Sequence, residues 1–155
     1  MLYNRILIPT DGSAISNAAA RAGVDFAQAV NAEIVGLFVA PEPGYPNFAP
    51  TIPLDYPTEE EYKASVRTAG VAYLKDVRDA AAAAGLKFTG ITLFSDATAR
   101  EIVRVAANND CDLIFMGSHG RSGVERLLLG SVTSKVLAIC NVPVLVYPSK
   151  ADEPG

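Results

Sequence analysis

The stretch from residue 112 to residue 131, DLIFMGSHGRSGVERLLLGS, joins an apolar segment to a glycine-rich one. Residues 112–116 predict a short strand buried on both faces, as in parallel sheets that are covered by helices. Three glycines spaced three apart follow directly, and Gly130 then precedes a hydroxyl residue. Such a loop turns several backbone N–H groups toward one point and forms a concave anion site. The stretch therefore predicts an α/β fold with an anion-binding loop after one strand.

The rest of the chain alternates between predicted strands and predicted helices. Apolar runs predict the strands, which occupy residues 5–9, 32–39, 87–94, 112–116 and 142–147. Helical spacing of apolar residues predicts a helix from Ser13 to Val30, one from 58 to about 84, one around Ile102–Ala106 and one over 131–140. Ser13 is the expected N-cap of the first helix, residues 58–61 (TEEE) form a capping box, and Gly85 ends the second helix.

Five strands that alternate with four helices predict a single-domain, open parallel sheet with helices on both faces. Crossovers in such sheets are right-handed, and we expect the strand order 3-2-1-4-5. Ligands of open α/β sheets bind beyond the carboxyl ends of the strands where the order reverses, here between strands one and four. Pro9-Thr10-Asp11 and Met116-Gly117 border that crevice. We expect the domain to cover residues 1–148 and residues 149–155 to be a flexible tail.

Composition excludes several classes of function. The chain has 155 residues, half of them hydrophobic, which suits one globular domain. A net charge of −4 argues against nucleic acid and anionic membrane surfaces as main partners. No apolar run approaches the about 18 residues of a membrane span, and Arg5 interrupts the first one, so we expect no signal peptide. Cys111 and Cys140 lie far apart beside apolar runs, which predicts buried free thiols in a cytoplasmic protein.

The glycine-rich stretch has the pattern G-x2-G-x9-G-[ST]. Gly130 and Ser131 open a helix whose free N–H groups and dipole favour an anion, and Ser131 and Thr133 add hydroxyl donors. The simplest occupant is a phosphate chain. Neither GxxxxGK[ST] nor GxGxxG occurs in the sequence. The block Leu127–Leu129 predicts a segment that turns inward and anchors the loop on the core.

The segments LIFMGSHGRSGVERLLLGSVTSKVL (113–137), VPVLVY (142–147) and RILIPTDGS (5–13) resemble the ATP-binding branch of the universal stress protein family. The resemblance covers nearly the whole chain. It implies a flavodoxin-like sheet, ATP binding, and a homodimer that often forms by antiparallel pairing of the last strands. An Mg²⁺ ion can accompany such a nucleotide through its phosphates, although no cluster of His, Cys, Asp and Glu suggests a dedicated metal site.

The same resemblance assigns nucleotide contacts to particular residues. Asp11 would meet the ribose or adenosine side, and Pro9 and Thr10 would line it. The backbone of Val39, at the end of the second strand, would contact adenine. Ribose and phosphates would be held by two segments: Met116, Gly117, Ser118, His119, Gly120, Arg121, Ser122 and Gly123, then Gly130, Ser131, Val132 and Thr133.

Several of these features have alternative interpretations. The glycine loop could be a surface connection, and Asp11 could serve only as the cap of the first helix. His119 lacks a carboxylate or cysteine partner in the sequence pattern, so we expect a hydrogen-bonding loop residue and no catalytic residue. Arg121 and Arg126 would neutralise phosphate or lie on a solvated face. Residues 41–57 hold six prolines and form either a stiff surface connection or a partial lid or partner-docking surface.

Three functions compete on this reading. The first is a regulatory module in which ATP occupancy alters the dimer or its exposed loops, to be read by an unknown protein partner. The second is a slow ATP hydrolase or a self-phosphorylating protein, with Ser118, Ser122 and Ser131 as phosphate acceptors. The third, a flavin-binding redox protein, depends on sheet order alone. The sequence offers a phosphate cradle but no P-loop lysine and no clear general base, which favours the first.

Overall fold

The computed structural model describes residues 2–44, 54–119 and 129–148. Within them the elements are β1 (Arg5–Pro9), α1 (Ala14–Val30), β2 (Glu33–Ala40), α2 (Glu59–Ala83), β3 (Phe88–Phe94), α3 (Thr98–Asn108), β4 (Leu113–Gly117), α4 (Ser131–Ile139) and β5 (Val144–Tyr147). Each predicted strand and helix is present, with small differences at the ends. Residues 149–155 lie outside the described residues, so the predicted tail stays a prediction.

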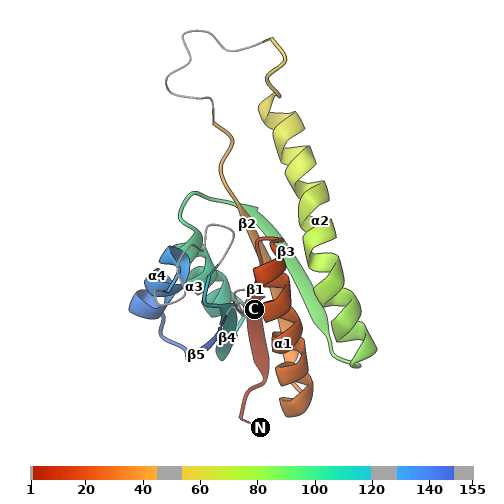
Figure 1. Cartoon of the computed structure of the whole chain (residues 1–155), viewed down its shortest axis with the longest axis vertical. Helices are drawn as coiled ribbons and strands as arrows, with labels where there is room; N and C mark the ends of the chain where they lie inside the picture. Colours follow the sequence, from red (N-terminus) through yellow and green to blue (C-terminus); the bar gives the residue numbers. More distant parts are fainter. Residues whose placement is uncertain (1, 45–53, 120–128, 149–155) are drawn as a thin grey trace, which may run out of the picture.

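The five strands form one sheet in the order β3-β2-β1-β4-β5, and every neighbouring pair is parallel. The predicted order 3-2-1-4-5 is therefore confirmed. Helices α1 and α2 cover one face of the sheet, and α3 and α4 cover the other (Figure 1). The order reverses between β1 and β4, because β2 and β3 extend the sheet on one side and β5 on the other.

The strand β1 is apolar on both of its faces, and this suits its place in the middle of the sheet. Ile6 and Ile8 are buried under α1, whereas Leu7 is buried on the opposite face with residues of α3. Each such side chain contributes about 1.5–3 kcal/mol relative to an exposed one. The continuous apolar run is thus the expected signature of a strand with helices on both sides.

Local signals set the ends of the two longest helices as predicted. The Ser13 hydroxyl accepts a hydrogen bond from Ser16 N at 3.1 Å, and Thr58 and Glu61 form a complete capping box. Gly85 follows α2 with a φ of +71°, a conformation that favours glycine.

Two expectations about apolar residues need correction. Leu129 was expected to help anchor the glycine loop on the core, but it is 46% exposed and lies directly before the start of α4. Cys111 is buried as expected, whereas Cys140, the C-cap residue of α4, is only half-buried. Burial raises the pKa of the Cys111 thiol to about 11, which makes it a packing residue and a poor nucleophile.

The first turns of α2 project beyond the rest of the molecule, together with the chain that leaves β2 (Figure 1). At a rise of about 1.5 Å per residue, this helix of 25 residues is about 37 Å long, longer than the strands it covers. Lys63 and Arg67 lie over the ring of Phe94 at the end of β3, which supports this part of the helix. Among the described residues, no helix combines the length and the apolar character needed to cross a bilayer.

Candidate functional site

The candidate site is the edge of the sheet where β1 and β4 end side by side. β1 pairs with β4 through Ile6–Leu113 and Leu7–Ile114. Beyond the strands, Thr10 N donates to Leu37 O at 2.8 Å and Ser118 N donates to Tyr147 O at 2.9 Å. Both segments therefore continue the sheet for one more residue beyond the strands.

The turn after β1 is held by its own polar side chains. The Thr10 hydroxyl, in a residue only 5% exposed, accepts from Gly12 N at 3.2 Å and from the Ser16 hydroxyl at 3.1 Å. The Ser16 hydroxyl in turn accepts from Asp11 N at 3.1 Å. Asp11 Oδ1 accepts from Ser13 N at 2.9 Å, so this carboxylate shapes the turn while Ser13 caps α1. Asp11 is therefore not the N-cap.

The junction between β4 and α4 depends on close contact between two backbone segments. Gly130 N donates to Ser118 O at 2.8 Å, and the Thr133 hydroxyl donates to Gly117 O at 2.9 Å. A Cβ on Gly130 would lie 3.1 Å from Ser118 O and 3.2 Å from His119 Cα. Glycine at this position lets the N-terminus of α4 reach the carboxyl end of β4.

The N-terminus of α4 offers backbone donors. Its N-cap is Gly130, which supplies no side-chain acceptor, and Ser131 at the first helical position is exposed. The first N–H groups of a helix have no partner within the helix and, with its dipole, attract anions. The start of α4 thus presents donors beside the end of β4.

Ser118 and His119 are 8% and 9% exposed, and both lie at this junction. The Ser118 hydroxyl and His119 Nδ1 are 3.1 Å apart and share a hydrogen bond whose direction depends on the tautomer. Within residues 2–44, 54–119 and 129–148, no carboxylate bonds to His119. The predicted role of His119, a loop residue that hydrogen-bonds to phosphate or backbone, stays a prediction.

The remaining predicted site residues fall into three groups. Met116, Val39 and Val132 pack into the apolar core on the sheet face that α3 and α4 cover. Pro9 is half-buried at the end of β1, and Thr133 is 2% exposed with its hydroxyl hydrogen directed at Gly117. Gly120, Arg121, Ser122 and Gly123 lie outside the described residues, as does Arg126.

No metal-binding group of three or more His, Cys, Asp and Glu side chains occurs within residues 2–44, 54–119 and 129–148. The structure brings together Thr10, Asp11, Ser118, Gly130 and Ser131 around one sheet edge by the pairing of β1 with β4. Among these groups, the backbone N–H groups at the start of α4 and the Ser131 hydroxyl are donors of the kind that bind phosphorylated molecules.

Two residues of this region escaped the sequence interpretation. Ser16 is 8% exposed and bonds to both Thr10 and Asp11; a serine on the buried stripe of an amphipathic helix was the available signal. Tyr73, from α2, packs its ring against Gly12, and a residue so distant in sequence leaves no local signal.

Comparison with known proteins places this architecture in context. The model of the universal stress protein family matches residues 2–148. Universal stress protein MJ0531 of Methanocaldococcus jannaschii is 34% identical over 98% of this chain and 86% of its own length. Universal stress protein YxiE of Bacillus subtilis is 30% identical over 94% of this chain and 99% of its own length.

Solved structures agree with these sequence matches. The structure of MJ0577 of M. jannaschii superimposes with a TM-score of 0.79 at 27% identity, covering 98% of this chain and all of MJ0577. A universal stress protein in complex with cAMP superimposes with a TM-score of 0.68 at 25% identity, covering 96% of this chain and 99% of that one. With the family match, the full-length relatives and the shared fold, this chain belongs to the universal stress protein family.

Proposed function

We propose that this protein binds ATP at the edge of the sheet between β1 and β4 and acts as a nucleotide-dependent regulatory module in the stress response. The observation that carries the proposal is the contact of Gly130 N with Ser118 O, which brings the uncapped N-terminus of α4 to the carboxyl end of β4. Backbone donors at the point where the strand order reverses suit a polyphosphate. The cAMP complex of a relative supports an adenine nucleotide as the ligand class.

In the proposed complex the chain contributes three groups of contacts. The phosphates lie at the backbone N–H groups of Gly130–Thr133 and at the exposed Ser131 hydroxyl, together with the glycine motif that starts at Gly117. Asp11, Thr10 and Pro9 line the ribose side, and the backbone of Val39 meets adenine. An Mg²⁺ ion would be carried by the phosphates, whose charge it offsets.

A regulatory role accounts for these residues better than turnover does. The Thr133 hydroxyl donates to Gly117 O, and within the described residues no carboxylate orients the His119 ring as a general base. Hydrolysis or self-phosphorylation, at Ser118 or Ser131 in the described part of the loop, is the alternative, and it requires charge neutralisation and a positioned nucleophile. Binding of ATP would then change the exposed segments next to the site, and partner proteins would recognise that change.

The proposal extends to assembly and location. β5 pairs only with β4 among the described strands, so its other edge can pair with the β5 of a second copy and form the homodimer. Leu137 and Ile139 of α4, the helix that precedes β5 in the chain, are exposed and add apolar surface. Two free cysteines are consistent with a reducing cytoplasm.

Calorimetric titration of the full chain with ATP, AMP, cAMP and GTP tests the binding proposal. We expect ATP to bind and to raise the melting temperature, and Gly130→Ala to weaken binding about tenfold, since the added Cβ pushes α4 away from Ser118. Gly44→Ala is the matched control, because a Cβ there meets nothing within 4 Å. An unchanged melting temperature at millimolar ATP contradicts the proposal, and steady phosphate release favours the enzyme.

A further inference from the structure

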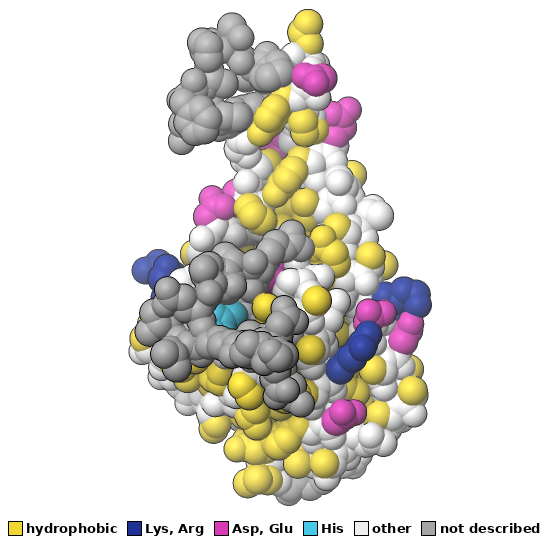
Figure 2. Space-filling view, viewed as in Figure 1, with side chains coloured by type: hydrophobic (Ala, Val, Ile, Leu, Met, Phe, Trp, Pro, Cys, Tyr) yellow, Lys and Arg dark blue, Asp and Glu magenta, His cyan; other side chains and the backbone are white. Residues whose placement is uncertain are grey.

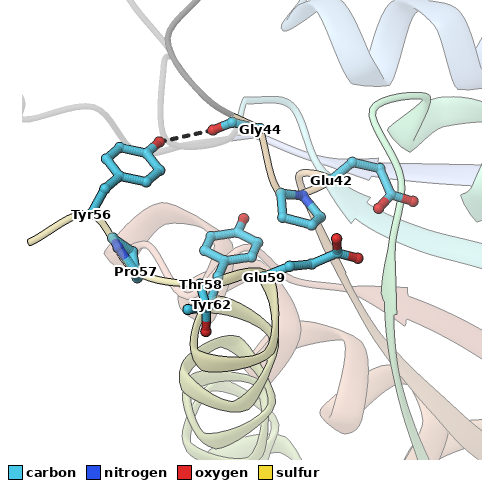
Figure 3. A pocket seen from close by; sticks show the side chains of 8 residues that line it. Glu42, Gly44, Tyr56, Pro57, Thr58, Glu59 and Tyr62 are labelled. Atoms are coloured by element: carbon cyan, nitrogen blue, oxygen red, sulfur yellow. Dashed lines mark hydrogen bonds between the residues drawn. The ribbon is translucent and has the colours of Figure 1, made fainter. Parts of the chain in front are cut away.

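A pocket whose lining shares no residue with the proposed nucleotide site lies where the chain that leaves β2 meets the first turn of α2 (Figure 3). Two aromatic rings and two prolines form its apolar walls, namely Tyr56, Tyr62, Pro43 and Pro57. Glu42 and Glu59 also line it, and Figure 3 shows their carboxylates extending on the same side of the pocket. Its volume is about 180 Å³.

Hydrogen bonds hold the walls of this pocket in place. The Tyr56 hydroxyl donates to Gly44 O at 2.8 Å, and the Tyr62 hydroxyl donates to Pro41 O at 2.8 Å. The capping box of Thr58 and Glu61 holds the turn from which Glu59 and Tyr62 extend. The two sides of the pocket are thus tied together by side chains of its own walls, and a ligand would find it formed.

The charge around the pocket is negative. Glu59, Glu60 and Glu61 occupy the first turn of α2, and Glu42 faces them from the other segment. The negative charge of these four carboxylates exceeds the partial positive charge at a helix N-terminus, which is about half an elementary charge. Lys63 offsets part of it, through its contact with Glu59 Oε1 at 3.0 Å. On the face shown in Figure 2, acidic and hydrophobic side chains occupy the projecting end of the molecule, and Lys and Arg lie lower.

The size and the lining of the pocket select its occupant. Pockets for drug-sized molecules measure about 300–1,000 Å³, so 180 Å³ suits a single side chain. A guanidinium group stacks on aromatic faces and pairs with carboxylates at the same time, as the lining here requires. A neutral proline ring would pack against the apolar walls. It would, however, displace water from the Glu42 carboxylate without offering it a hydrogen-bond donor, which is unfavourable.

We propose that this pocket binds an arginine side chain of a partner protein, held between the tyrosine rings with its guanidinium at Glu42 and Glu59. The site is independent of the nucleotide proposal, because none of its lining residues belongs to the edge between β1 and β4. The described ends of the segment 41–57, Glu42–Gly44 and Tyr56–Pro57, would then line a docking surface, which is one of the roles that its proline content left open.

NMR titration of the full-length, ¹⁵N-labelled protein with the peptide acetyl-Gly-Arg-Gly-amide tests this proposal without any nucleotide. We expect shifts at the amides of Gly44, Thr58 and Tyr62, and weaker binding of the neutral peptide in which citrulline replaces arginine. Glu42→Gln should weaken arginine binding about two- to fivefold, the range of an exposed charge pair. Glu60→Gln removes the same charge one residue from the pocket lining and should leave the affinity unchanged.

Three results would overturn the proposal. One is the absence of shifts at tens of millimolar peptide. Another is equal binding of the arginine and citrulline peptides, or stronger binding of a neutral proline peptide. The third is an equal loss in Glu42→Gln and Glu60→Gln, which would show general attraction to an acidic surface instead of a pocket for one side chain. Circular dichroism of each variant separates these outcomes from unfolding of the first turn of α2.

Discussion

The ring of Tyr73, from α2, lies against Gly12 in the turn between β1 and α1. A Cβ on Gly12 would be 2.5 Å from Tyr73 Cδ1. The same ring meets the ring of Phe38 edge-on, with centroids 5.0 Å apart. Tyr73 thus ties α2 to β2 and to the turn that carries Asp11, so the geometry of the proposed nucleotide site depends on the placement of a long helix on the sheet.

Replacement of Gly12 should therefore destabilise the protein more than its exposure suggests. In Gly12→Ala the new Cβ overlaps the Tyr73 ring, and the φ of +78° is unfavourable for alanine by about 1 kcal/mol. With overpacking, we expect a total loss of about 2–3 kcal/mol in the free energy of unfolding, measured with urea. Gly44→Ala serves as the control and should change the stability little.

The contribution of the ring can be separated by adding Tyr73→Leu to Gly12→Ala. The double variant should be more stable than the sum of the two single changes predicts, because the overlap is relieved while the backbone strain persists. Strict additivity would show that contact with Tyr73 is not the reason for the glycine.

Thr133→Val should weaken the junction between β4 and α4. The replacement keeps the shape of the buried side chain but removes its hydrogen bond to Gly117 O, which costs about 1–2 kcal/mol of stability. Because the start of α4 shifts, we also expect weaker ATP binding by calorimetry. Thr133→Ser keeps the hydroxyl and should recover most of the ATP affinity. Equal affinity in the valine and serine variants would mean that this hydrogen bond does not position the site.

Asp112 links the start of β1 to the start of β4, at the amino ends of the strands and thus at the opposite end of the sheet from the proposed nucleotide site. Burial would raise the pKa of this carboxyl, but hydrogen bonds from Asn4 N, Arg5 N and Asn4 Nδ2 outweigh it and lower the pKa below its usual value. A lowered pKa stabilises the fold above the pKa of the unfolded chain, about 3.9, and this stabilisation is lost as the pH falls through the folded value.

Asp112→Asn should accordingly cost about 1 kcal/mol at pH 7, allowing for solvent screening of a half-buried group, and its deficit should shrink toward pH 3. Urea unfolding of both proteins across this pH range measures the difference. Asp110→Asn is the control, since Asp110 is exposed and asparagine tolerates its positive φ. A deficit for Asp112→Asn that stays constant with pH would contradict the assignment.

Val146→Pro should prevent the proposed dimer without dissolving the sheet. The carbonyls of Pro143 and Tyr147 accept bonds from β4, so alternate residues such as Val146 direct their backbone groups to the free edge of β5. Proline there removes an outward N–H group. We expect sedimentation velocity to show a dimer for the original chain and a monomer for the variant, with similar circular dichroism spectra. A dimer that persists in Val146→Pro would place the interface elsewhere.

The predictable parts of this protein depend on residues close together in the chain. The caps at Ser13 and Thr58 and the stop at Gly85 are local hydrogen-bond or φ preferences, and a single sequence contains them. The strand order followed from right-handed crossovers and from the family resemblance. The exposure of Leu129 could not be predicted, because a run of three leucines has no periodicity from which burial of one residue could be inferred.

The sequence by itself determined the alternation of strands and helices, the parallel sheet and the glycine motif after β4, because periodicity, capping and turn chemistry act over a few residues. Only the tertiary structure decided that Thr133 bonds to Gly117, that Tyr73 covers Gly12, and that Glu42 and Glu59 share a pocket. These pairs come from separate segments of the chain. Their contacts arise when helices pack on the sheet, and packing joins residues whose separation in sequence follows no repeating pattern.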